Sequence, residues 1–202
     1  MQKQKITFNK DVINAIDLSP LQKYSNWRTD FAQYFNKDAG TEHYKLLAYL
    51  SLEIQSPKII EIGTFVGNGT NALSYNEAKS VESYDIFSSF PTDPEILTVE
   101  AKSNVKCFVK DCVGELHNIV KDTDLLFIDI DHTGYTERIM MDELEKIGYK
   151  GLVLLDDTKL NEGMVTFWNS ITQEKLDISD YGHWSGTGIV NFDPSRFEIV
   201  VA

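Results

Sequence analysis

Cysteine, proline and flexible linkers are scarce in this sequence, and each scarcity excludes a class of protein. The chain of 202 residues has two cysteines, Cys107 and Cys112, whose spacing fits neither a zinc site nor a redox motif. We therefore expect two reduced thiols in a cytoplasmic protein. Five scattered prolines and no repeat or low-complexity tract predict one domain. Within it, we expect residues 1–55 to form an N-terminal helical extension and residues 56–202 to form the main part.

Positive charge is in the minority, and long apolar runs are missing. Lysine and arginine number 19 against 31 aspartates and glutamates, which gives a formal net charge of −12. Such a chain repels the nucleic acid backbone and anionic membranes, so we expect neither as a partner. No segment is apolar enough for a transmembrane helix, and the first ten residues lack the apolar core of a signal peptide. A homodimer is left open.

Short apolar runs that alternate with helical patterns are what the sequence does contain. Near-continuous apolar strands separated by helices indicate a parallel sheet that is buried on both faces. We predict an α/β fold with a Rossmann-like, doubly wound, mostly parallel seven-stranded sheet and helices on both faces. The candidate strands are residues 58–62, 80–86, 105–109, 124–130, 151–155, 188–192 and 197–201, and the candidate helices are residues 42–55, 69–78, 94–102, 113–120 and 135–147.

A glycine-rich turn follows the first of these strands. In doubly wound sheets, ligands bind at the carboxyl ends of the strands. Glycines at such a turn permit positive φ angles and let a ligand approach the backbone, while the next helix offers unpaired N–H groups. The alternative is an ordinary tight turn. The residues that we expect to bind a cofactor here are Glu61, Gly63, Thr64, Gly67, Gly69 and Thr70.

Acidic residues follow the next two strands. Asp85 is either placed to accept hydrogen bonds from a ribose diol or is a solvated residue at a strand end. Asp111 and Cys112 follow the third strand. Asp111 either meets the edge of an adenine ring or caps a helix that starts at Val113.

Carboxylates gather at the ends of the fourth and fifth strands. Asp129 and Asp131 end the fourth strand, and Asp156 and Asp157 follow the fifth. Neighbouring carboxylates repel one another unless protons or a cation compensate, and Mg²⁺ or Mn²⁺ prefers oxygen ligands. The alternative is that Asp131 or Thr133 caps the next helix and that Asp157 starts a turn.

Taken in order, these segments resemble the class I S-adenosylmethionine (SAM)-dependent methyltransferases. The run from Glu61 to Thr70 is similar to their first glycine-rich motif, whose glycines lie under the methionine part of the cofactor. The resemblance implies that Asp85 holds the ribose and that Asp111 and Cys112 lie near the adenine. It covers about residues 40–192.

The fourth and fifth strand ends narrow the resemblance to the small metal-dependent O-methyltransferases of the catechol and caffeoyl-coenzyme A type and their antibiotic- and sugar-modifying relatives. By position, Asp129, Asp156 and Asp157 would hold Mg²⁺. Catechol-type enzymes have a lysine as the base three residues after the first ligand, where this chain has His132. The implied reaction transfers a methyl group from SAM to a hydroxyl oxygen of a small molecule. Asp129, which is also expected to contact the cofactor, and His132 are the expected catalytic residues.

Aromatic residues outside these motifs have two interpretations. A glycine-rich loop that carries His183 and Trp184 either lines a substrate pocket or is a surface connection. Trp27, Tyr34 and Phe35 either cover the pocket as a lid or belong to the core. The other two histidines of the chain are assigned no role.

Two other functions compete with methyl transfer. Residues 67–72 satisfy the G-x-G-x-x-A pattern of NAD(P)-dependent dehydrogenases, with Asp85 at a suitable distance. That pattern should begin directly after the strand, whereas Gly67 comes five residues beyond Ile62. A non-catalytic binding module that keeps the cofactor fold is the second alternative, against which the cluster of acids argues. The sequence leaves the acceptor, and the choice between O- and N-methylation, open.

Overall fold

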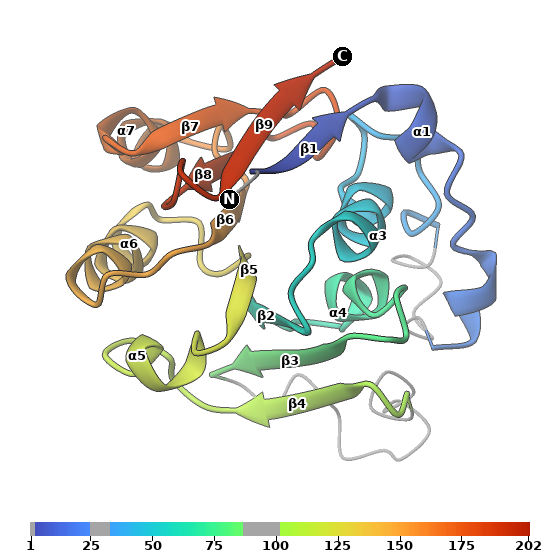
Figure 1. Ribbon diagram of the computed structural model, residues 1–202, viewed down its shortest axis with the longest axis horizontal. Coiled ribbons are helices and arrows are strands. Elements are labelled where there is room, and N and C mark those ends of the chain that lie inside the picture. Colours follow the sequence, from blue (N-terminus) through green and yellow to red (C-terminus); the bar gives the residue numbers. More distant parts are fainter. Residues whose placement is uncertain (1–2, 25–32, 87–101) are drawn as a thin grey trace.

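A seven-stranded sheet forms the centre of the molecule in the computed structural model, which describes residues 3–24, 33–86 and 102–202 (Figure 1). The strand order is β4-β3-β2-β5-β6-β8-β7. The first five strands in this order run parallel, while β8 is antiparallel to both of its neighbours. The strands are β2 (Lys58–Ile62), β3 (Ser80–Asp85), β4 (Val105–Val109), β5 (Thr123–Ile128), β6 (Leu152–Asp156), β7 (Glu174–Asp177) and β8 (Thr187–Asn191).

Helices cover both faces of this sheet, as the apolar strands require. Alternate residues of β5 illustrate the arrangement, because Phe127 packs into one hydrophobic cluster and Leu126 and Ile128 into the other. On the first face lie α3 (Tyr44–Glu53) and α4 (Asn68–Leu73), and on the other lie α5 (Leu116–Ile119), α6 (Tyr135–Lys146) and α7 (Glu162–Ser170) (Figure 1). The predicted fold class, a doubly wound and mostly parallel sheet, is confirmed.

The predicted N-terminal extension is not wholly helical. Its first element is a strand, β1 (Gln4–Phe8), which is followed by α1 (Lys10–Asn14) and the 3₁₀ helix η1 (Ser19–Tyr24). Strand β1 pairs in parallel with β9 (Phe197–Val201), and the two form a separate two-stranded sheet (Figure 1). Residues 197–201 are therefore a strand, as expected, but they do not belong to the main sheet.

The seventh strand of the main sheet is β7, which the sequence pattern did not predict. It lies at the sheet edge and reads Glu-Lys-Leu-Asp, with two exposed and two half-buried residues, so it lacks the apolar run of a central strand. Helix α7 was also not predicted. Its start depends on Asn161, whose side chain accepts a hydrogen bond from the backbone N–H of Met164 at 3.0 Å.

Some predictions fall on residues that the structure does not describe. All but the last residue of the expected helix at residues 94–102 lies outside the described ranges. Trp27 also lies outside them. Phe35 is fully buried and packs against Tyr44, with 5.5 Å between ring centroids, so it belongs to the core.

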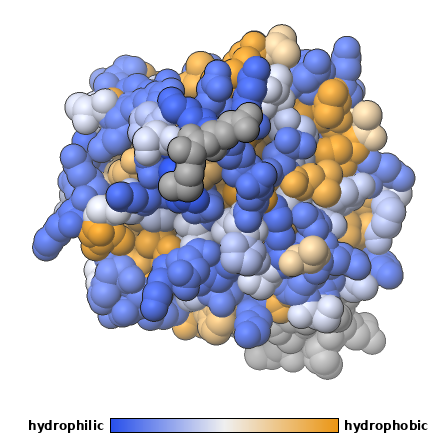
Figure 2. All heavy atoms as spheres, in the orientation of Figure 1, coloured by the Kyte–Doolittle hydropathy of each residue, from blue (hydrophilic) through white to orange (hydrophobic). Residues whose placement is uncertain are grey.

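Polar residues cover most of the face shown in Figure 2, with apolar residues scattered among them. Within the described ranges, no helix combines the length and the apolarity needed to cross a membrane.

The β1–β9 pair should unfold together with the main sheet, because Phe8 is fully buried in the larger hydrophobic cluster beside Tyr49 and Tyr181. We expect Phe8→Ala to lower the free energy of unfolding by about 3–5 kcal/mol. The matched control Val12→Ala removes a side chain that is 53% exposed, and should change stability by no more than about 0.5 kcal/mol. Urea unfolding measures both. A separate early transition for the Phe8 variant would contradict a single cooperative unit.

Candidate active site

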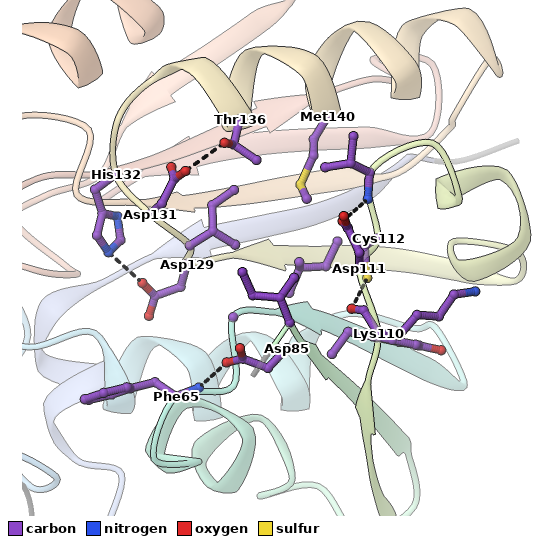
Figure 3. A pocket seen from close by; sticks show the side chains of 16 residues that line it. Phe65, Asp85, Lys110, Asp111, Cys112, Asp129, Asp131, His132, Thr136 and Met140 are labelled. Atoms are coloured by element: carbon purple, nitrogen blue, oxygen red, sulfur yellow. Dashed lines mark hydrogen bonds and ion pairs between the residues drawn. The ribbon is translucent and has the colours of Figure 1, made fainter. Parts of the chain in front are cut away.

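A cavity of about 650 Å³ opens at the carboxyl ends of β2, β3, β4 and β5. The strand order reverses between β2 and β5, and doubly wound sheets bind ligands at such a point. Figure 3 shows residues from several strand ends and from α6 pointing into the same space. Its predicted site residues are Gly63, Asp85, Asp111, Cys112, Asp129 and His132, and they are joined by Ile62, Phe65, Tyr84, Ile86, Lys110, Val113, Ile130, Asp131, Thr136 and Met140.

Gly63 brings the glycine-rich turn against the end of β5. Its φ angle is +100°, and a Cβ atom built on it would overlap the backbone carbonyl of Asp129. The two strands are also joined by the backbone N–H of Asp129, which donates to the carbonyl of Ile62 at 2.9 Å. Only glycine satisfies both the dihedral angle and the close approach, so this residue fixes one wall of the cavity.

The other predicted residues of the turn lie behind the cavity wall rather than on it. Glu61 is 1% exposed and accepts hydrogen bonds from Ser83 Oγ at 2.5 Å and from Thr70 Oγ1. Gly69 leaves the room that this carboxyl group occupies, because a Cβ there would overlap Glu61. Thr64 Oγ1 lies 2.6 Å from Ser83 Oγ, and Gly67, at a φ of +81°, is the N-cap of α4. Glu61, Thr64, Gly67, Gly69 and Thr70 therefore support the turn from inside.

Asp85 holds the tip of the turn. Its Oδ2 accepts a hydrogen bond of 2.8 Å from the backbone N–H of Phe65, whose φ angle is +44° (Figure 3). The carboxylate also lines the cavity at the end of β3. The structure thus places this carboxylate in the cavity wall and shows that it also shapes the turn.

Asp111 lies in the cavity wall and does not cap a helix that starts at Val113. Its Oδ1 accepts from the backbone N–H of Val113 at 2.9 Å, which is a local turn, and α5 begins only at Leu116. The residue lines the cavity together with Cys112. Burial raises the pKa of the Cys112 thiol to about 12, so this group is a neutral part of the wall.

Asp131 lines the same cavity but supports the start of α6. It accepts hydrogen bonds from Thr133 Oγ1 at 3.0 Å and from Thr136 Oγ1 at 2.7 Å (Figure 3). Burial acts to raise its pKa, and the hydrogen bonds from Thr136 and Thr133 outweigh it, so the pKa is lowered. The N-cap of α6 is Gly134, so neither Asp131 nor Thr133 is the cap considered from the sequence.

His132 bridges two of the predicted acids. Its Nε2 lies 3.3 Å from Asp129 Oδ1 and 3.4 Å from Asp157 Oδ2. His132 and Asp157 have positive φ angles of 54° and 57°, which are strained for residues with a side chain. Surrounding contacts hold the strained turn, because Glu137 Oε1 accepts from the His132 N–H and Asn161 Nδ2 donates to the His132 carbonyl.

Two further histidines complete the cluster. His183 Nδ1 lies 3.4 Å from Asp156 Oδ2 and 3.2 Å from Asp157 Oδ1, and His43 Nδ1 lies 3.3 Å from Asp156 Oδ2. His183 Nε2 faces Glu42 Oε2 at 3.6 Å. Sequence reasoning assigned no role to His43 or Glu42, because only the packing of α3 against the sheet brings them to the end of β6.

These contacts divide the charge among the acids. Burial acts to raise the pKa of Asp156. His43 and His183 together lower it by more, so the pKa of Asp156 falls well below the ordinary value. Burial acts to lower the pKa of His43, and Asp156 outweighs it and raises the pKa to about 9. Burial, and then the charge of Asp156, raise the pKa of Asp129. Asp156 is therefore held ionised, while Asp129 is the acid on which a proton is most readily held.

The predicted substrate residues separate in space. His183 belongs to the cluster, whereas Trp184 is 68% exposed and contacts His183 edge-on, with ring centroids 5.6 Å apart. Among the described residues, the group that could hold a metal ion consists of His43, Asp156 and His183. It shares only Asp156 with the predicted ligand set of Asp129, Asp156 and Asp157.

Comparison with known proteins gives matches at the level of structure alone. No family model and no curated protein sequence matches the chain. The SAH-bound methyltransferase PaMTH1 of Podospora anserina aligns with a TM-score of 0.56 at 14% identity over 86% of each chain. The O-methyltransferase of Bacillus cereus in complex with SAH aligns with a TM-score of 0.57 at 15% identity over 90% of this chain and 96% of that one.

A third structure gives the same result. The O-methyltransferase TomG of Streptomyces achromogenes, involved in tomaymycin synthesis and solved in complex with SAM, aligns with a TM-score of 0.56 at 15% identity. The alignment covers 91% of this chain and 99% of that one. At this level of identity the likeness shows the fold, and the resemblance to class I methyltransferases is confirmed as a shared fold.

The contact of Gly63 with the Asp129 backbone should be visible in stability. We expect Gly63→Ala to lower the free energy of unfolding by about 3–5 kcal/mol, because it combines a strained φ angle with a steric overlap. Gly148→Ala is the matched control, since Gly148 has a φ of +68° and open space around its Cβ position. It should cost about 1 kcal/mol. Equal losses in the two variants would show that the dihedral angle alone matters.

Burial of Glu61 should make stability depend on pH. Burial raises the pKa of Glu61 to about 8, although the hydrogen bonds from Ser83 and Thr70 act to lower it. The folded state therefore binds a proton on Glu61 more tightly than the unfolded state does. Its contribution is complete below about pH 4.5 and is lost as the pH rises through about 8. Urea unfolding at several pH values should show a smaller loss over this window for Glu61→Gln than for the parent protein. Glu198→Gln, at an exposed strand position, should leave the pH dependence unchanged.

Proposed function

We propose that this protein transfers a methyl group from SAM to a hydroxyl oxygen of a small molecule, with the help of a divalent cation, Mg²⁺ or Mn²⁺. One observation carries the proposal: a single cavity joins Asp85, Asp111 and Gly63 to Asp129 and His132 at the switch point of the sheet. The shared fold adds support, because solved structures with this fold contain SAM or SAH.

The cavity has the chemistry that SAM requires. Its volume of about 650 Å³ lies within the range of small-molecule sites. The carboxylate of Asp85 suits a ribose diol, and the apolar side chains of Ile86, Val113 and Met140 suit the faces of an adenine ring. Asp111 suits the ring edge. SAM supplies an electrophilic methyl group, and the task of the protein is to align this methyl group with the acceptor oxygen.

His132 is the residue that we assign to proton removal. It lines the cavity, and its Nε2 lies within 3.4 Å of both Asp129 and Asp157. A proton taken from the acceptor hydroxyl would be held at Nε2, which faces Asp129 and Asp157. Its strained backbone and its fixed turn keep the ring at the cavity edge.

A cation fits beside this base. Asp129, Asp156 and Asp157 gather at the strand ends and contact histidines, and Asp156 Oδ1 is buried without a hydrogen-bond partner among the described residues. An ion held there would lower the pKa of an acceptor hydroxyl. Asp156, Asp157 and Asp129 are the acids that we propose for this role.

The wider setting of the proposal follows from charge. A net charge of −12 disfavours nucleic acid and anionic membranes, so we propose a small-molecule acceptor and a cytoplasmic location. The dehydrogenase alternative gains nothing from the structure, because Gly67 and Gly69 support α4 and Glu61 and do not line the cavity. A homodimer would be compatible with every step above.

The decisive measurement is isothermal titration with SAM, with NAD⁺ as the control ligand. We expect SAM to bind and NAD⁺ not to bind. Asp85→Asn should weaken SAM binding by about 10–100-fold, since it removes a charged hydrogen-bond acceptor but keeps an oxygen for the Phe65 N–H. Asp142→Asn changes an exposed acid outside the cavity and should have no effect.

Two outcomes would contradict the proposal. NAD⁺ binding in place of SAM binding would favour the dehydrogenase, and no binding of either would favour a non-catalytic module. Asp156→Asn should lower methyl transfer far more than SAM affinity, and equal losses would show that the cofactor and cation sites are not separate.

A further inference from the structure

We infer that His43, Asp156 and His183 form a metal site that prefers a later first-row transition ion, such as Co²⁺, over Mg²⁺. One potential ligand atom from each residue lies within 4.8 Å of the other two. The catalytic meaning of such an ion rests on the proposed function, but its binding can be measured separately. The ligand set predicted from the sequence was Asp129, Asp156 and Asp157. The set inferred here keeps Asp156 and has two histidines in place of the other two acids.

The three residues converge from distant parts of the chain. His43 directly precedes α3, Asp156 ends β6, and His183 lies in the loop between β7 and β8. Asp156 Oδ2 is the common point, 3.3 Å from His43 Nδ1 and 3.4 Å from His183 Nδ1. These distances place two nitrogen donors and one oxygen donor around a single small volume, next to the acids of the proposed active site.

Unpartnered buried atoms are the second observation that points to a ligand. His43 and Asp156 are each 4% exposed. Among the described residues, His43 Nε2 and Asp156 Oδ1 have no hydrogen-bond partner, and His43 Nδ1 has only the ion-pair contact with Asp156 Oδ2. Buried polar atoms without partners are costly, so their presence here demands an explanation. A cation between the imidazoles and the carboxylate would satisfy nitrogen and oxygen lone pairs together.

Neighbouring side chains fix the orientation of both imidazole rings, as is typical of histidines that bind a metal ion. His183 presents Nδ1 to Asp156, while its other nitrogen, Nε2, faces the carboxylate of Glu42 at 3.6 Å. A carboxylate on the far nitrogen of a histidine fixes the ring and strengthens the near nitrogen as a ligand. His43 is held edge-on by Phe127 and Tyr44, with ring centroids 5.4 and 4.7 Å away. Both rings are thus placed before an ion arrives.

The donor set decides which ion fits. Mg²⁺ demands oxygen ligands and rarely accepts imidazole, whereas imidazole suits first-row transition ions. Asp129 and Asp157 remain close by and face His132, and Asp157 Oδ1 also lies 3.2 Å from His183 Nδ1. Three protein ligands also leave coordination positions for a small molecule, as catalytic metal sites do. Two histidines and one carboxylate therefore predict selection against Mg²⁺.

The test begins with ion binding by the full chain. After treatment with a chelator, the protein is titrated with Co²⁺, Mn²⁺ or Mg²⁺ alone, followed by calorimetry and, for Co²⁺, by its visible absorption. We expect one equivalent of Co²⁺ to bind about 100-fold or more tightly than Mg²⁺, with a spectrum that shows nitrogen ligation. Equal affinities, or Mg²⁺ binding alone, would overturn the inference.

Variants assign the ligands. His183→Ala should weaken Co²⁺ binding by about 100-fold or more, and Glu42→Gln by about 10–100-fold. The control His117→Ala alters the one histidine outside the cluster, which is exposed, and should leave affinity unchanged. His183→Asp substitutes an oxygen donor and should shift the preference toward Mg²⁺. A folded His183→Asp protein with an unchanged ratio of Co²⁺ to Mg²⁺ affinity would overturn the assignment, and thermal unfolding checks that each variant is folded.

Asp129→Asn separates this site from the all-carboxylate alternative. We expect it to leave Co²⁺ affinity nearly unchanged, because Asp129 is not among the three ligands. A large loss in Asp129→Asn with none in His183→Ala would restore the three-acid site. SAM titration of the same samples keeps the questions apart: Co²⁺ binding at the histidines without SAM binding supports this inference while it refutes the proposed function.

Discussion

Mutual compensation of charge between buried carboxylates and imidazoles is the interaction on which this end of the molecule depends. Asp156 lies almost wholly out of solvent, where an isolated carboxylate would be strongly destabilising. His43 and His183 compensate it, and each comes from a different element. The charge cluster therefore ties α3, β6 and the loop before β8 together at one edge of the sheet, next to the cavity.

The sheet supplies the common edge. Strands β2 and β5 are neighbours, and the strand order reverses between them. The loops that follow their carboxyl ends therefore lead in opposite directions and leave room between the helices. The contact of Gly63 with Asp129 joins these two ends, so the cavity wall and the first acid of the cluster share one backbone contact. Any shift of the glycine-rich turn would move both, which links the shape of the cavity to the position of the acid.

Prediction from sequence succeeded where the signal is local. Apolar runs marked β2, β5 and β6, and the residues that follow them, such as Asp129 and Asp156, had to meet at one edge of a parallel sheet. Strand β7 lacks that signal because an edge strand needs no apolar run. His43 could not be placed, because its neighbours depend on how α3 packs against the sheet, and nothing in its own segment specifies that contact. Glu61 was expected to bind a cofactor, and its burial in β2 behind the cavity wall, beside Ser83 and Thr70, was not foreseen because that packing joins separate segments.

The pairing of β1 with β9 bears on how the chain folds. These strands meet across almost the whole described chain, so their contact has one of the largest sequence separations that the fold contains. Closing so large a loop costs conformational entropy before the β1–β9 contact can stabilise the fold. Contacts between residues far apart in sequence therefore slow folding. During synthesis, the apolar residues Ile6 and Phe8 emerge long before their partners and cannot be buried beside them until β9 has been made. During synthesis, β1 therefore has no pairing partner until β9 has been made.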